Sequence, residues 1–336
     1  MPILRTPASG SSERTRRDGA ARLVVLAAVL TVTLGALGAC DARVDHSTHA
    51  RAGETASSTP KDERRRQPGS PTPSGAATAR EDAAATLPAL PNGRSAVNLA
   101  VQVSVAERTL HDPGARSRDV RRAGEFGQLA ARLLATAPEQ FRRDVLARLG
   151  PRIRSKTRLD VEASSLLNAM TSPQPRLPEW RIVEAPPPRH LLGLYRLAAR
   201  RVGVPWTYLA AIHLVESRMG RIRGVSSAGA QGPMQFLPTT WDLYGAGGDI
   251  DDPRDAILAA ARLLRANGAP EDMAGAVWHY NPSDNYVGAV TRYAEAIERS
   301  ALAYRGYWHW RVLYKHVRGT YVLDRGYPEV PARRLG

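Results

Sequence analysis

Apolar residues recur at helical spacing in the middle of the chain. Between residues 127 and 149, leucine, phenylalanine and valine fall near every third or fourth position, which predicts helix. Residues 190–202 show the same spacing. Gly203 then suits the end of that helix, and Pro205 suits the first turn of the next one. The pattern therefore predicts a small helical region over 96–172 and further helices beyond it.

A proline-rich segment separates two helical parts of the chain. Residues 173–189 contain PQPRLPEW and EAPPPR, which interrupt helical structure repeatedly and predict a linker. Residues 190–300 then show consecutive helical patterns. We therefore expect a mainly α-helical fold.

The last residues of the chain have a different pattern. Residues 301–336 are rich in aromatic and β-branched side chains. Polar and apolar positions alternate over 308–314 and over 320–323, with Gly319 between them. This alternation predicts a short C-terminal β-hairpin extension.

The N-terminal segment has the features of an export signal. Residues 23–37 form an uncharged apolar run after several arginines, which is typical of a signal-peptide core. The run ends in Leu-Gly-Ala-Cys and resembles the bacterial lipobox, whose cysteine, here Cys40, becomes the lipidated first residue. We expect residues 1–39 to be a lipoprotein signal peptide and the protein to be a membrane-anchored lipoprotein of the cell envelope, facing the cell wall. The alternative is an uncleaved anchor, which also exports the chain.

A compositionally biased segment follows the cysteine. Residues 40–95 are rich in serine, threonine, proline, alanine and arginine and have no sustained hydrophobic period. Such a composition predicts a disordered tether between the lipidated Cys40 and the helices.

The distribution of charge limits the classes of partner. The net charge is +15, but it divides into +9 for residues 1–186, +1 for 187–300 and +5 for 301–336. A nearly neutral central part argues against a nucleic-acid cleft, whereas basic flanks suit anionic lipid or anionic wall polymers. Cys40 is the only cysteine, so an intramolecular disulfide is excluded. We expect no metal and no cofactor.

One acidic residue lies on an apolar helix face. Within 205–217, Leu209, Ile212 and Glu216 are spaced by three and four, which places the carboxylate beside apolar side chains. Burial raises the pKa of a carboxyl group and can make it a proton donor near neutral pH. By itself this spacing fits a buried structural partner as well as a catalytic acid.

Three motifs place Glu216 in a recognisable context. Val-Glu-Ser-Arg at 215–218 is followed by Gly-Pro-Met-Gln-Phe-Leu-Pro at 232–238 and by Trp-His-Tyr-Asn at 278–281. In this order they resemble the lytic transglycosylases of the SLT type, which share a lysozyme-like α-helical fold. The resemblance covers about 190–300 and is nearest to the membrane-bound B-like branch and its actinobacterial relatives. Pro233 and His279 depart from the usual residues at their positions.

The resemblance implies a substrate and roles for individual residues. The substrate would be peptidoglycan glycan strands, and Glu216 would act first as general acid and then as general base. Substrate binding would involve Ser217, Met234, Gln235, Tyr280 and Asn281, the last two contacting Glu216 or the scissile sugar.

The absence of a second acidic motif indicates a mechanism. A retaining glycosidase places a second carboxylate about 5 Å from the first, and no acidic residue in a matching motif is evident. In this family the 6-hydroxyl of the sugar closes the ring and leaves 1,6-anhydroMurNAc ends. A hydrolytic muramidase of the same fold and a catalytically silent wall-binding lipoprotein are the alternatives.

The acidic run at 249–255 is interpreted as helix capping around Asp252 and Pro253 rather than a cation site.

Overall fold

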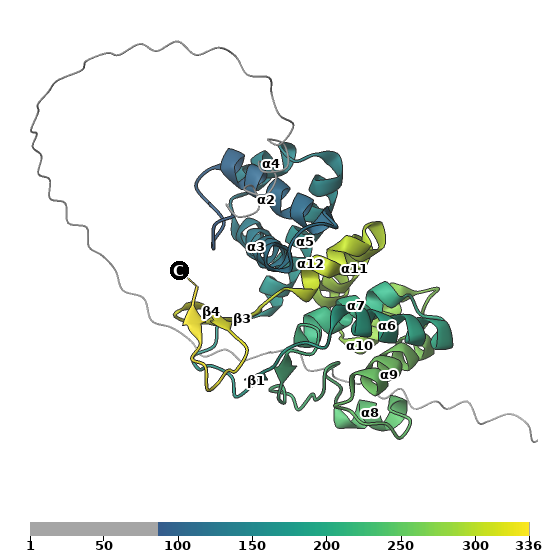
Figure 1. Ribbon diagram of the computed structural model, residues 1–336. Helices are drawn as coiled ribbons and strands as arrows, with labels where there is room; N and C mark the ends of the chain where they lie inside the picture. Colours follow the sequence, from purple (N-terminus) through teal and green to yellow (C-terminus); the bar gives the residue numbers. More distant parts are fainter. Residues whose placement is uncertain (1–86, 336) are drawn as a thin grey trace, which may run out of the picture.

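Helices α2 to α5 form a layer with a core of its own. The computed structural model describes residues 87–335, and Figure 1 labels its elements from α2 onward. The layer consists of α2 (Ala96–His111), α3 (Ser117–Thr136), α4 (Glu139–Ala147) and α5 (Pro151–Met170). Each helix contributes buried apolar side chains to one cluster, among them Leu99, Phe126, Val145 and Val161. We call these helices the N-terminal layer.

The predicted N-terminal features fall largely outside the described residues. The signal peptide at 1–39, Cys40 and most of the tether at 40–95 lie there, and they stay predictions. Leu87 is 1% exposed and packs in the core of the N-terminal layer, so the packed chain begins before residue 95. Among residues 87–335, no helix is long and apolar enough to cross a bilayer.

In the described part of the chain, seven further helices surround a second and larger core. They are α6 (Pro188–Val202), α7 (Trp206–Ser217), α8 (Pro238–Tyr244), α9 (Pro253–Ala266), α10 (Met273–Tyr280), α11 (Asp284–Arg299) and α12 (Ala301–Trp308). Their cluster includes Tyr195, Leu209, Ile257 and Tyr293, each at most 1% exposed. Helix α11 packs against both α5 and α7 and so joins this core to the N-terminal layer.

Two small antiparallel sheets complete the fold. Strand β1 (Arg181–Ile182) pairs with β2 (Ile222–Arg223), while β3 (Val312–His316), β4 (Gly319–Leu323) and β5 (Arg333–Arg334) form the other sheet. In the hairpin Val312 pairs with Leu323 and His316 with Gly319. The mainly α fold with a C-terminal hairpin is therefore confirmed.

The hairpin starts later than the alternation of residues predicts. Residues 301–308 form α12, because Ala303, Tyr304 and Tyr307 follow helical spacing and are buried in the larger core. The aromatic content of this segment suits a strand, but contact with the helices decides its conformation.

The proline-rich segment is bound to the hairpin. The backbone N–H of Gln174 donates to the Lys315 carbonyl at 2.9 Å, and the backbone N–H of Val317 donates to the backbone carbonyl of Gln174 at 3.0 Å. Ile182 of β1 donates to the carbonyl of Tyr327 at 3.0 Å. The segment at 173–189 thus has a fixed path that places β1 beside β2.

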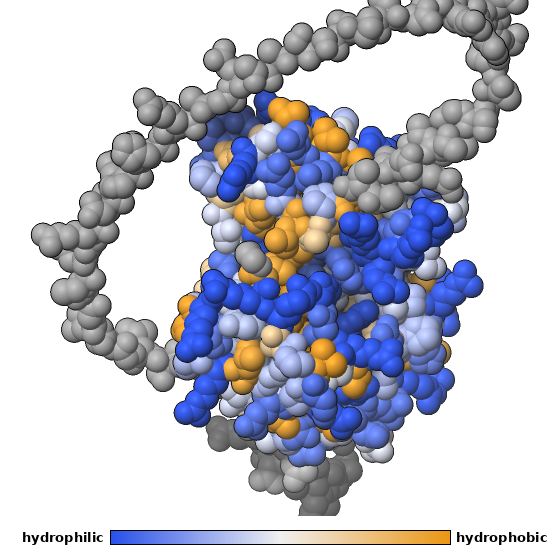
Figure 2. Space-filling model, turned by 60° about the vertical axis from the view of Figure 1, so that its left-hand side comes forward, coloured by the Kyte–Doolittle hydropathy of each residue, from blue (hydrophilic) through white to orange (hydrophobic). Residues whose placement is uncertain are grey.

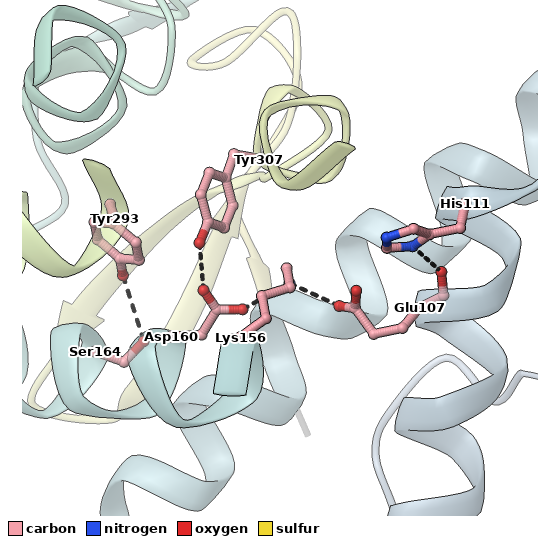
Figure 3. Close-up of polar contacts among 7 residues, drawn as sticks. All are labelled: Glu107, His111, Lys156, Asp160, Ser164, Tyr293 and Tyr307. Carbon is pink, nitrogen blue, oxygen red and sulfur yellow. Dashed lines mark hydrogen bonds and ion pairs between the residues drawn. The ribbon is translucent and has the colours of Figure 1, made fainter. Parts of the chain in front are cut away.

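Buried charges link the N-terminal layer to α12. Lys156 of α5 lies 2.7 Å from Glu107 of α2 and 2.8 Å from Asp160, and the Tyr307 hydroxyl of α12 donates to Asp160 (Figure 3).

On the outside, polar side chains cover most of the face in Figure 2, and apolar residues gather in its upper and middle parts.

Candidate active site

Glu216 lies in the last turn of α7, where the core meets a cleft. Helix α6 ends at Gly203 in the left-handed conformation (φ 81°), as the sequence predicts, and Pro205 lies at the N-cap position of α7, one residue before the first turn that the sequence predicts for it. Leu209 and Ile212 on α7 are fully buried, whereas Glu216 is half-buried and lines the cleft. The carboxylate therefore lies at the end of a helix with a buried apolar face and is open to a ligand.

Two opposing effects set the acidity of Glu216. Burial raises the pKa of its carboxyl group to about 7. The Tyr286 hydroxyl of α11 donates to Oε1 of Glu216 at 2.5 Å, and this hydrogen bond lowers the pKa because it stabilises the carboxylate. Near neutral pH the group can therefore both give and accept a proton.

Tyr286 is a site residue that the motifs do not reveal. It lies in the first turns of α11, and its ring stacks parallel to Tyr280 with centroids 6.4 Å apart. Burial raises the pKa of both hydroxyls well above the usual value, so both remain proton donors. The sequence feature that could have pointed to Tyr286 is its position shortly after the Tyr-Asn motif. Tyr286 makes the hydrogen bond to the Glu216 carboxylate, and a contact of Tyr280 and Asn281 with the scissile sugar stays a prediction.

The Gly-Pro-Met-Gln motif forms a tight loop facing Glu216. Gln231 and Phe236 pair across it, with N–O distances of 2.8 and 2.9 Å. Gly232 has a φ of 72°, and a Cβ there would lie 2.0 Å from the carbonyl oxygen of Ile250. Only glycine fits this position. The Tyr280 hydroxyl donates to the Met234 carbonyl at 2.5 Å and ties the loop to α10.

Two predicted substrate contacts have buried side chains. Ser217 is 0% exposed; its hydroxyl donates to the Pro233 carbonyl at 2.5 Å and accepts from the Gly220 amide at 3.0 Å. Met234 is also 0% exposed. Neither lines the cleft: Met234 packs in the larger core, and the Ser217 hydroxyl is occupied by these two hydrogen bonds. In this structure Ser217 holds the loop beside α7 and Met234 packs in the core, while sugar contacts of the two residues stay predictions.

The other predicted binding residues do line the cleft. Gln235, Tyr280 and Asn281 surround the space in front of Glu216. Gln235 has a φ of 50°, an uncommon conformation for a residue with a side chain, and its amide Nε2 donates to the Gly232 carbonyl at 2.9 Å. Asn281 Oδ1 is buried and has no hydrogen-bond partner among the described residues. This oxygen is available to a ligand donor.

One carboxylate of the described residues lines the cleft. Its volume is about 300 Å³, and Glu216 is the only acidic side chain among the described residues that line it. Asp252 instead caps α9 by accepting from the amides of Arg254 and Asp255, which confirms the capping interpretation. Within residues 87–335, no three His, Cys, Asp or Glu side chains gather in a possible metal site.

Comparison with known proteins identifies the part of the chain that carries this geometry. Residues 194–302 match the family model described as the Transglycosylase SLT domain. The chain contains a transglycosylase SLT domain. No significant similarity to a curated protein or to a solved structure was found. The SLT domain implies peptidoglycan as the substrate and relates the chain to the lysozyme-like enzymes.

The cleft extends beyond the SLT domain. The domain supplies Glu216, the Gly-Pro-Met-Gln loop and the two stacked tyrosines. The remaining wall comes from α3, α5, the segment at 173–180 and β3, which all lie outside the match. The N-terminal layer and the hairpin therefore form part of the cleft.

Proposed function

We propose that this protein is a lytic transglycosylase that cleaves the MurNAc-β-1,4-GlcNAc bond of peptidoglycan without water and leaves 1,6-anhydroMurNAc ends. The observation that carries the proposal is that Glu216 is the single carboxylate among the described residues of the cleft and that burial raises its pKa to about 7. A group of this acidity can serve as acid in one step and as base in the next.

The two steps assign opposite protonation states to Glu216. The protonated carboxyl donates to the glycosidic oxygen as the bond breaks, and the resulting carboxylate accepts the Tyr286 hydrogen bond. The carboxylate then removes the proton from the 6-hydroxyl of the MurNAc residue as the 1,6-anhydro ring closes. Since no second carboxylate of the described residues lines the cleft, the N-acetyl group of the substrate takes the place of an enzymatic nucleophile.

Neighbouring residues support this chemistry in two ways. Asn281 offers an unpaired oxygen to a sugar hydroxyl or amide N–H. Ser217 acts as a positioning residue, because its hydroxyl joins the end of α7 to the loop that carries Gln235. The carboxylate and the opposite wall of the cleft are thus held by direct hydrogen bonds.

Glu216→Gln keeps the shape of the side chain and removes the titratable proton. We expect the variant to release soluble fragments from purified sacculi at least about a thousandfold more slowly than the parent, within the range for loss of a general acid. Glu298→Gln is the matched control, because Glu298 is exposed on α11 and does not line the cleft. Mass spectrometry of the fragments identifies the new ends.

The products separate the proposal from its alternatives. Anhydromuramyl ends support transglycosylation, whereas reducing MurNAc ends would identify a muramidase. Equal release by Glu216→Gln and the parent would remove Glu216 from the mechanism. No release by the parent would leave a wall-binding protein without catalysis.

A further inference from the structure

Among the described residues, three cations line the cleft without an acidic partner. They are Arg132 of α3, Arg218 at the end of α7 and Lys315 of β3. None forms an ion pair within the described residues, although ion pairs join many other side chains of the same part of the chain. Glu216 is the only carboxylate among the described lining residues, and at neutral pH it is partly protonated. The cleft therefore carries excess positive charge.

The structure accounts for one of these cations. The Lys315 ammonium donates to the carbonyl of Thr171 at 2.8 Å and to Oδ1 and the carbonyl of Asn168 at 3.0 and 3.4 Å. These acceptors lie at the C-terminal end of α5, where a cation is favoured by the helix dipole. Lys315 thus has a structural role.

The two arginines are less well accounted for. Arg132 donates from Nη2 to the Thr320 hydroxyl at 2.8 Å, and Arg218 donates from Nη1 to the Leu214 carbonyl at 2.6 Å. A guanidinium has five N–H donors, so each keeps donors for a ligand. Burial lowers the pKa of both groups, and the charge of Arg132 adds to the lowering at Arg218. Two like charges that interact in one cleft are unfavourable unless an anion joins them.

We propose that Arg132 and Arg218 bind a carboxylate of the peptide stem carried by the glycan strand. This inference rests on the proposed function, because it concerns the substrate of the same cleft. The sugars of a strand are uncharged where the muramyl carboxyl is amide-linked to a stem, so the glycan itself offers no partner for the arginines. The stem ends in a carboxylate, and guanidinium groups match carboxylates with paired hydrogen bonds.

The position of Arg132 assigns a role to the elements around the SLT domain. Arg132 lies on α3, outside residues 194–302, while Arg218 lies two residues after Glu216. The N-terminal layer thus brings a stem-binding group to a catalytic cleft. Strands with charged stems would be preferred over strands whose stems have been neutralised.

The test compares two forms of one substrate. Glycan strands are freed of phosphate polymers with hydrofluoric acid, and half of the sample is amidated so that every stem carboxylate becomes a carboxamide. For the full-length parent we expect amidation to lower kcat/KM about tenfold, mainly through KM, as for the loss of one charge-assisted hydrogen bond. Arg132→Gln should lose about tenfold on charged strands and less than twofold on amidated strands.

Two variants make the result specific. Arg132→Lys keeps a positive charge and should recover part of the loss, whereas Arg201→Gln removes an exposed charge of α6 away from the cleft and should change neither substrate. Activity of Arg132→Gln on amidated strands shows that the variant folds. If it were inactive on both forms, restoration by Arg132→Lys on charged strands alone would support the inference, and equal restoration on both forms would overturn it.

The outcomes separate the inference from the proposed function. Cleavage of both forms by the parent at equal rates would overturn stem recognition and leave the enzymatic assignment intact. A loss of kcat/KM in Arg132→Gln that appears only on strands retaining phosphate polymers would assign the arginines to phosphate binding. That result would also overturn stem recognition. Failure of the parent to cleave either form would contradict the proposed function itself.

Discussion

At the scale of single residues, the hydrogen bond between Tyr286 and Glu216 adjusts a proton donor. Burial raises the pKa of Glu216, and the tyrosine hydroxyl limits the rise by donating to the ionised form. In the proposed mechanism Glu216 is the general acid and needs its proton, so activity should fall as the pH rises through about 7. The falling limb of the pH profile therefore reports on Glu216.

Tyr286→Phe should move this limb to higher pH. The substitution removes the hydrogen bond that favours the carboxylate, so the protonated acid persists at higher pH. The measurement is kcat/KM against pH for the parent and the variant on solubilised glycan strands. Tyr244→Phe on α8, outside the cleft lining, should leave the limb in place. A limb that stays fixed or moves to lower pH in Tyr286→Phe would contradict this account.

At the scale of elements, the Gly-Pro-Met-Gln loop depends on contacts that local sequence does not encode. Its hydrogen bonds to Ser217 and Tyr280 come from α7 and α10, and the Ile250 carbonyl lies against Gly232. The sequence predicts the helices and the Asp252 cap because their signals lie within one turn. The family resemblance implies substrate binding by Ser217 and Met234, whose side chains the packing turns inward.

Gly232→Ala should destabilise the protein and reduce cleavage. Gly247 is the matched control, because its φ of 76° is similar but a Cβ there meets nothing within 4 Å. Gly247→Ala should cost about 1–2 kcal/mol from the left-handed backbone. Gly232→Ala should cost about 1–3 kcal/mol more from the clash with Ile250. Urea unfolding measures both, and equal losses would show that the loop moves freely.

At the scale of the whole molecule, α5 connects the N-terminal layer to the larger core. Lys156 on this helix is 12% exposed at its side chain, and its partners Glu107 and Asp160 are 5% and 4% exposed. Burial alone would lower the pKa of Lys156, but the two carboxylates outweigh it and raise the pKa. The ammonium therefore stays charged between α2 and the Tyr307 hydroxyl of α12 (Figure 3).

Lys156→Met should destabilise the whole fold. Removing the cation leaves two buried carboxylates uncompensated, a change that costs about 3–5 kcal/mol. Arg265→Met breaks an exposed pair with Glu271 and should cost less than about 1 kcal/mol. Urea unfolding at pH 7 gives both values. Similar losses for the two variants would mean that the buried ions make no special contribution.

The sequence by itself determined the helical character of the chain, the C-terminal hairpin and the Asp252 cap, and its motifs singled out Glu216 as the candidate acid. Each depends on residues a few positions apart or on the order of short motifs along the chain. Tertiary structure alone decided that Tyr286 meets Glu216, that Ser217 faces inward and that Arg132 reaches the cleft. These contacts join residues far apart in sequence, because they depend on how α3, α7 and α11 pack, and no local pattern specifies that packing.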